Sequence, residues 1–163
     1  MRTIKFRGFS QKKGEWVYGS LHVFEALRQP SSPKTYIRSG QQNRDWIKVA
    51  PSSVGESVGL SDINEGEIYE GDYISIVYKY DGLSANLGVI PDQDCFCEGV
   101  VVYMSEVASW GIRLYKAEYP IKEDLERCEF LIVPLSEFDL EPDSIEVKGN
   151  AYANPELLKG GEE

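Results

Sequence analysis

Short runs in which apolar and polar side chains alternate recur along the whole chain, and turn residues separate them. In the run 73–78, Ile74, Ile76 and Tyr78 fall on one face of an extended strand, and the residues between them fall on the other. About ten such runs occur, and they do not alternate regularly with helical segments. The sequence therefore predicts a mainly β protein built from short antiparallel strands.

Two segments break this pattern and indicate short helices. Ile121, Leu125 and Cys128 lie at helical spacing, after a proline and among acidic residues. Near the end of the chain, Asn154 is expected to cap a helical turn that begins at Pro155. We therefore expect one or two short helices beside the strands.

A dense run of turn residues divides the chain into two regions. Residues 1–65 are predicted to form an N-terminal β-hairpin region, and residues 66–163 contain five successive strand-like runs. We expect these five strands to close into a small SH3-like barrel, because closure removes edges that so small a sheet could not protect. The polar stretch 80–88, with the turn signal Asp81-Gly82, is predicted to be a loop.

The charge balance argues against one class of function. The chain carries 17 Lys and Arg against 27 Asp and Glu, a formal net charge of −10. A surface this acidic repels phosphate, so nucleic acid is an unfavoured partner. A basic patch near the N-terminus is interpreted as the solvated face of the first strand. The patch consists of Arg2, Lys5, Arg7, Lys12 and Lys13.

The apolar runs, the cysteines and the single histidine bear on localisation and on cofactors. No run approaches the ~20 apolar residues of a membrane span, and residues 1–20 lack the apolar centre of a signal peptide. We therefore expect a cytoplasmic protein without membrane contact. Cys95, Cys97 and Cys128 form an odd set that fits buried, reduced thiols. With His22 as the only histidine, the sequence predicts neither a metal site nor a cofactor.

The phrase Glu70-Gly71-Asp72 leads directly into the strand-like run 73–78. Gly71 can adopt the backbone angles of a tight turn, and Asp72 can accept hydrogen bonds from nearby backbone N–H groups. The phrase is therefore interpreted as the start of a strand. The alternative is an acid–base or metal site made of Glu67, Glu70 and Asp72, but nothing nearby in the sequence supplies a base or a nucleophile.

Four aromatic residues are candidates for contact with a partner. Trp16, Tyr18, Trp46 and Trp110 could form a binding strip, although packing in the core or at a subunit interface is the preferred interpretation. His22 has no acidic or cysteine neighbour at the spacing of a catalytic triad, so it is interpreted as a surface residue of a strand.

Four segments in order give the chain a family resemblance. They are "MRTIKFRGF" with "GEWVYGSL", "VAPSSVGESVGL", "INEGEIYEGDYI" and "IEVKGNAYANPELL", which together span residues 1–158. This arrangement resembles the YopX-like family of phage and prophage proteins. The chain departs from the family pattern at Ser57-Val58 before Gly59-Leu60, and the acidic "SDINEGE" replaces a more basic turn.

The resemblance implies architecture more than chemistry. It implies a mostly β protein with an SH3-like barrel in its C-terminal part, expressed from phage or prophage genes and prone to self-association. The segment around 79–99 reads as a variable insert particular to this member. The closing motif, with Gly149, Asn150, Asn154 and Pro155, is assigned a structural role. The family brings no established activity, so no catalytic residue is carried over.

Three hypotheses about function remain open at this point. The first is a non-enzymatic interaction or structural module that binds itself or an unknown host or phage protein. The second is a small-barrel protein that associates with nucleic acid or mimics it. The third is an enzyme of unrecognised type that uses the acidic residues near 67–72.

Overall fold

The structure, a computed structural model, describes most of the chain. The described residues are 4–24, 34–40, 46–84, 88–118, 120–128, 130–141 and 143–158, with the backbone alone at 80–93. Within them lie eleven β-strands and a single α-helix, which confirms the mainly β class. The chain divides into two compact units, Met1–Val58 and Gly59–Glu163, so the boundary expected at 65/66 falls inside the second unit.

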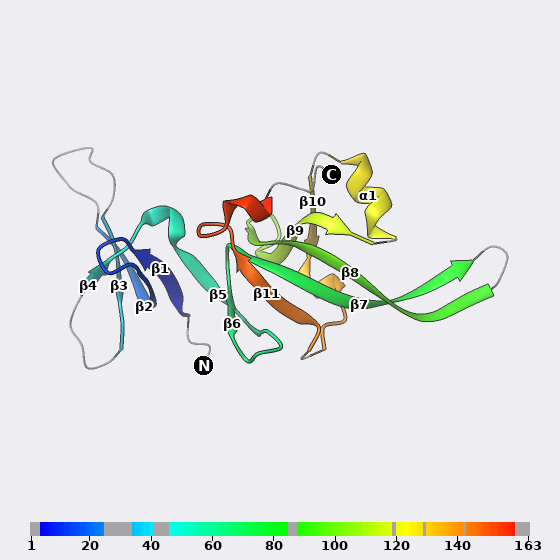
Figure 1. Ribbon diagram of the computed structural model, residues 1–163, viewed down its shortest axis with the longest axis horizontal. Coiled ribbons are helices and arrows are strands. Elements are labelled where there is room, and N and C mark those ends of the chain that lie inside the picture. The colour runs from blue at the N-terminus through cyan, green and yellow to red at the C-terminus, as the bar shows by residue number, and fades with distance from the viewer. Residues whose placement is uncertain are drawn as a thin grey trace. The chain divides into compact units, whose positions relative to one another are not determined.

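The first unit is an antiparallel sheet of short strands in the order β4-β3-β2-β1 (Figure 1). β1 forms a hairpin with β2, and β3 forms another with β4, as expected of an N-terminal β-hairpin region. The start of the next strand, β5, pairs with β1. The strands are β1 (Phe6–Ser10), β2 (Glu15–Phe24), β3 (Lys34–Arg38), β4 (Trp46–Lys48) and β5 (Gly55–Ser61).

One face of this sheet forms the core of the first unit. Val17, Ile37 and Val49 are buried there, and Phe6, Leu21, Ile47 and Val54 pack against them. Gly8 fits into this core because it lacks a side chain: a Cβ at this position would lie 2.8 Å from a methyl carbon of Val49. The opposite face of the sheet therefore carries the other half of the alternating residues.

The second unit is built on a five-stranded antiparallel sheet in the order β10-β9-β8-β7-β11. Its core includes the fully buried Ile74, Ile76, Val101 and Ile112. The short strand β6 (Glu67–Tyr69) precedes this sheet. The sheet strands are β7 (Asp72–Ser84), β8 (Gly88–Met104), β9 (Ser109–Ala117), β10 (Leu131–Pro134) and β11 (Ile145–Asn150).

The described strands do not close this sheet, because β10 and β11 stand at its two ends. The SH3-like barrel therefore stays a prediction, while the antiparallel all-β architecture is confirmed. Closure would need a ladder between β10 and β11, and no such ladder joins them in the part of the chain that the structure describes.

The predicted loop over 80–88 is wrong for most of its length. β7 continues to Ser84 and β8 begins at Gly88, and the two are paired as far as Ser84 opposite Gly88. Figure 1 shows them as one long hairpin. Backbone hydrogen bonds need no apolar side chains, so a polar, glycine-containing stretch can extend a ladder. Much of the insert around 79–99 is thus strand, and residues 85–87 lie outside the described set.

Both predicted helical segments are present. α1 (Ile121–Arg127) covers the segment with helical spacing, and a 3₁₀ turn (Pro155–Leu158) follows Asn154. Further 3₁₀ turns occur at Pro51–Ser53 and Leu135–Glu137. Among the helices of the described residues, none is long and apolar enough to cross a membrane.

Candidate functional site

The Glu-Gly-Asp phrase and the closing motif, far apart in sequence, meet inside the second unit. Asp72 is 2% exposed. One of its carboxylate oxygens accepts a hydrogen bond from the N–H of Tyr69 at 2.8 Å, and the other accepts from the side-chain amide of Asn150 at 3.4 Å. Gly71, with φ of +82°, accepts a hydrogen bond from the N–H of Ala151 at 2.8 Å. These contacts tie the entry of β7 to the end of β11.

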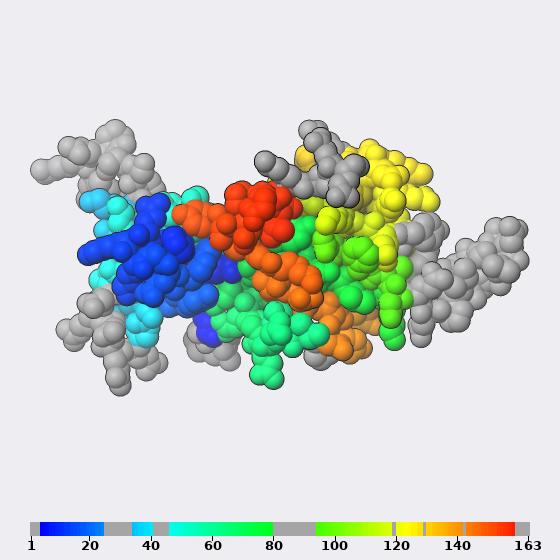
Figure 2. Space-filling model, viewed as in Figure 1, coloured from blue at the N-terminus to red at the C-terminus, as the bar shows by residue number. Residues whose placement is uncertain are grey.

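The closing segment is folded back on itself by its two asparagines. The side-chain oxygen of Asn154 accepts from the N–H of Asn150 at 3.3 Å, and the N–H of Asn154 donates to the carbonyl of Asn150 at 2.8 Å. Asn154 thus lies directly before the 3₁₀ turn, as expected of a cap, but its side-chain oxygen binds Asn150. Figure 2 shows the segment in red at the surface, beside β11 in orange.

The three acidic residues weighed as an acid–base site have different surroundings. Asp72 is buried and held by donors of its own chain. Glu67 is exposed and accepts a hydrogen bond from the hydroxyl of Tyr69 at 2.6 Å, while Glu70 is half-buried. Among the described residues, no group of three or more His, Cys, Asp and Glu side chains is placed to hold a metal ion.

A second aspartate organises the turn before β6. A carboxylate oxygen of Asp62 accepts hydrogen bonds from the N–H groups of Gly66 at 2.7 Å and Asn64 at 3.0 Å. Burial by itself would raise the pKa of Asp62, but these donors outweigh it and hold the pKa below its usual value. The N–H of Ile63 also donates to the carbonyl of Ile145 in β11, at 2.8 Å, so the turn is fixed to the sheet.

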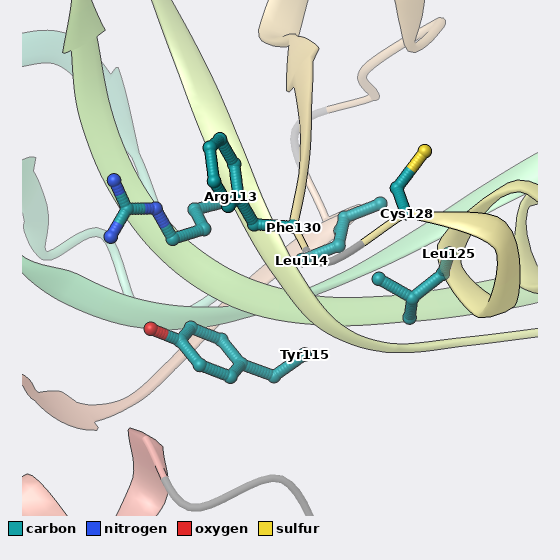
Figure 3. Close-up of a pocket in the computed structure, with 6 residues that line it drawn as sticks. All are labelled: Arg113, Leu114, Tyr115, Leu125, Cys128 and Phe130. Carbon is teal, nitrogen blue, oxygen red and sulfur yellow. The ribbon is translucent and has the colours of Figure 1, made fainter.

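An open pocket of about 380 Å³ lies between β9 and the segment around α1 (Figure 3). The guanidinium of Arg113 lies 5.7 Å from the ring centre of Phe130. In Figure 3 the sulfur of Cys128 points away from Tyr115. The six lining residues are Arg113, Leu114, Tyr115, Leu125, Cys128 and Phe130. They include no carboxylate and no histidine, so they do not supply an acid–base pair.

The cysteines differ from one another in exposure. Cys95 and Cys97 are buried on β8, as expected, but Cys128 is exposed, so the expectation that all three are buried was wrong. Burial, aided by the charge of Glu98, raises the pKa of the Cys97 thiol to about 12. Burial, with the charges of acidic neighbours, also raises the pKa of Cys95. Both buried thiols are therefore poor nucleophiles.

The outward face of the first unit carries many aromatic and basic side chains. Residues directly opposite each other in an antiparallel ladder project to the same side of the sheet. The register pairs Arg7 with Tyr18, Phe24 with Lys34, Tyr36 with Lys48, and Arg38 with Trp46. We call this the aromatic–basic face. Its aromatic and basic residues are Arg7, Phe9, Trp16, Tyr18, His22, Phe24, Lys34, Tyr36, Arg38, Trp46 and Lys48.

Four rings of this face, those of His22, Phe24, Tyr36 and Trp46, form one cluster of contacts. Trp46 meets His22 at 3.9 Å and Phe24 at 5.6 Å between ring centres, both edge to face. Phe24 also meets Tyr36 at 5.6 Å. Trp46 is 42% exposed, Phe24 53% and Tyr18 49%. Trp46 and Phe24 thus pack against each other while about half of each side chain stays open to solvent.

Arg7 corrects the interpretation of the N-terminal basic patch. Its side chain is only 7% exposed, and its guanidinium lies 4.9 Å from the ring centre of Trp16. It is therefore a cation–π partner in the sheet and not part of a solvated face. Lys5, Lys12 and Lys13 are exposed, and Arg2 lies outside the described residues.

Comparison with known proteins places the chain in a family. The family model described as YopX protein matches residues 5–159. The chain belongs to the YopX family. No curated protein matches it. Among solved structures, the chain matches the crystal structure of protein EF1440 from Enterococcus faecalis with a TM-score of 0.40. The two sequences are 20% identical, and the match covers 98% of this chain and 100% of EF1440.

In this YopX-family chain the four aromatic candidates are divided between the two units. Trp16, Tyr18 and Trp46 belong to the aromatic–basic face, whereas Trp110 lies on β9 in the second unit, 5.1 Å from the ring of Tyr103. Sequence reasoning missed Phe24, Tyr36 and the basic residues opposite the rings. The detectable signal was the alternation within residues 15–24 and 34–38, where every second position is aromatic or basic over much of the run.

Proposed function

We propose that this chain is a phage- or prophage-encoded, non-enzymatic binding protein of the bacterial cytoplasm that acts through its aromatic–basic face. The observation that carries the proposal is the half-exposed pair of Trp46 and Phe24, whose rings also contact those of His22 and Tyr36. Exposed aromatic side chains that cluster in this way are typical of binding sites and are uncommon elsewhere on protein surfaces.

The distribution of charge supports the same surface. Residues 1–58 hold 10 Lys and Arg against 4 Asp and Glu, whereas residues 59–163 hold 7 against 23. The formal charges of the two units are thus +6 and −16, which together give the −10 of the whole chain. The first unit is therefore basic although the chain as a whole is acidic. We expect a partner of the aromatic–basic face to carry negative charge.

The chemistry of the acidic residues supports a binding role over a catalytic one. The carboxylate of Asp72 is buried, and its donors join strands of the fold. The carboxylate of Asp62 is likewise taken up by the backbone of its own turn. Carboxylates used in this way stabilise the second unit and are not presented to a substrate.

Self-association is a second candidate function, favoured by the opposite charges of the two units. The basic face of one copy would meet the acidic unit of another, which is a head-to-tail contact between different surfaces. Electrostatic complementarity of this kind raises association rates and is weakened by salt.

A capture experiment tests the binding role. The tagged chain and a Phe24→Ala/Trp46→Ala variant are incubated with host lysate, with and without nuclease, and bound material is identified by mass spectrometry. The matched control is Tyr103→Ala/Phe130→Ala, which removes two exposed rings of the second unit. We expect capture to fail only for the first variant. Equal capture by all three proteins would rule out the aromatic–basic face as the binding surface.

Multi-angle light scattering of the same three proteins tests self-association. Assembly that disappears in 0.5 M salt, or with the Phe24→Ala/Trp46→Ala variant alone, would support the head-to-tail contact. A monomer at every concentration and at low salt would exclude it.

A further inference from the structure

We propose that the aromatic–basic face binds single-stranded nucleic acid; this inference rests on the binding role proposed above and names the class of partner. The acidic composition of the whole chain disfavours such a partner, because a net negative charge repels phosphate. Binding depends on the local arrangement of rings and cations on one sheet, which the overall charge does not describe.

The first observation is that cations stand directly opposite rings in the ladder. Lys34 faces Phe24 across β2 and β3, while Lys48 faces Tyr36 and Trp46 faces Arg38 across β3 and β4. Side chains at directly opposite positions have their Cβ atoms about 5 Å apart. Each pair thus offers a stacking surface for a base beside a positive charge for a phosphate, which is the combination that single-strand binding uses.

The second observation concerns the ion pairs and exposure of these cations. In the part of the chain that the structure describes, no ion pair engages Lys34, Arg38 or Lys48. The Nε of Arg38 is buried and has no hydrogen-bond partner among the described residues, so a phosphate would have to contact the terminal nitrogens of this side chain. Lys34 and Lys48 are exposed. A phosphate backbone could therefore reach these groups without first breaking an ion pair with a described carboxylate.

The third observation is the length of the surface. Tyr18 and Phe24 lie six positions apart on β2, which corresponds to roughly 20 Å along an extended strand. Sheets with exposed aromatic side chains stack two or three unpaired bases in this way. A duplex hides its bases in its own stack, and an acidic peptide would use the cations but leave the rings without partners. The arrangement therefore favours a single strand.

The test measures binding of a fluorescein-labelled 20-nucleotide oligothymidylate to the full chain by fluorescence anisotropy, at 50 and 200 mM salt. Trp46→Ala is compared with Tyr103→Ala, which also removes a half-exposed ring, but from the second unit. Lys48→Glu is compared with Lys79→Glu, since both lysines are exposed strand residues. Unlabelled duplex of the same length serves as competitor.

We expect Trp46→Ala to weaken binding by roughly tenfold or more, and Tyr103→Ala to leave it unchanged. Three phosphate contacts at roughly −0.7 each predict a slope of about −2 for log Kobs against log salt, which Lys48→Glu would make shallower. Circular dichroism verifies that each variant is folded. If Trp46→Ala does not fold, the surface variant Lys48→Glu still decides the question.

Any one of three results would overturn the inference. The first is no oligonucleotide binding at 50 mM salt, and the second is an equal loss of binding in each variant and its control. The third is a duplex that competes as well as a single strand.

The capture and self-association experiments test the proposed function separately. Self-association or protein capture that is lost only with Phe24→Ala/Trp46→Ala would keep the binding role but assign the face to protein. If neither nucleic acid nor protein binding depends on this face, the proposed function fails as well.

Discussion

The side-chain amide of Asn150 donates a hydrogen bond to the buried carboxylate of Asp72, although 78 positions separate the two residues in sequence. Their backbones are also partners in the ladder between β7 and β11. The contact therefore joins the two most distinctive phrases of the sequence at one point. The carboxylate of Asp72 is bound by a main-chain N–H and a side-chain amide of its own unit, so it contributes to the stability of the second unit.

Asp72→Ala is expected to destabilise the protein by about 2–4 kcal/mol, because it leaves the N–H of Tyr69 and the amide of Asn150 without their buried acceptor. Asp72→Asn keeps one acceptor and should cost less. Urea unfolding followed by circular dichroism measures both. The exposed Asp139→Ala is the control and should change stability by less than about 0.5 kcal/mol. An equal effect of Asp72→Ala and Asp139→Ala would show that the buried contact is unimportant.

Gly149→Ala is expected to destabilise the closing segment by about 1–3 kcal/mol through overpacking. A Cβ at this position would lie 2.7 Å from a methyl carbon of Leu157 and 2.9 Å from the side-chain oxygen of Asn154. Combining Gly149→Ala with Leu157→Ala should cost less than the sum of the single changes, since the smaller side chain relieves the clash. Strict additivity in thermal or urea unfolding would contradict this explanation.

Asp62→Ala is expected to lower stability by about 2 kcal/mol at neutral pH, because two backbone N–H groups lose a charged acceptor. The pKa of Asp62 is lowered in the folded protein, so its contribution is present above the unfolded pKa of 3.8 and is lost as pH falls through the folded value. The stability difference between wild type and variant should therefore shrink below about pH 4. Urea midpoints from pH 7 to pH 2.5 measure it, and a constant difference would contradict the assignment.

Native thiol labelling should modify one cysteine per chain. Cys128 is exposed, whereas Cys95 and Cys97 are buried and have raised pKa values that leave little thiolate at pH 8. A chromogenic disulfide reagent at pH 8 should therefore react quickly with one thiol in the folded protein and with all 3 in denaturant. The Cys128→Ser variant should show no fast reaction. Rapid labelling of two or more native thiols would show that β8 opens readily.

The hairpins of the first unit and the helix at Ile121–Arg127 were predictable because their signals are local. Alternation, helical spacing and turn residues act within a few positions of one another, and the structure contains the elements that they indicated. The family was also predictable, since four ordered segments carried the resemblance and the family model spans residues 5–159. The loop expected over 80–88 failed because polar residues permit a loop but do not prevent backbone pairing.

The aromatic–basic face was not predictable from the candidates considered singly. Trp46 and Trp110 have the same side chain, but strand order places the first beside His22 and Phe24 and the second beside Tyr103 in the other unit. The burial of Arg7 under the ring of Trp16 likewise depends on the register between β1 and β2. Register joins residues that are distant in sequence, and alternation within one strand does not specify it.

The sequence by itself determined the all-β class, the positions of most elements and membership of the YopX family, because each depends on local patterns or on ordered motifs. Tertiary structure alone decided that Asn150 would meet Asp72, and that rings from β2, β3 and β4 would gather on one basic face of an otherwise acidic chain. Charge and composition are sums over all residues, whereas a binding surface is made by the few that strand pairing brings to one side.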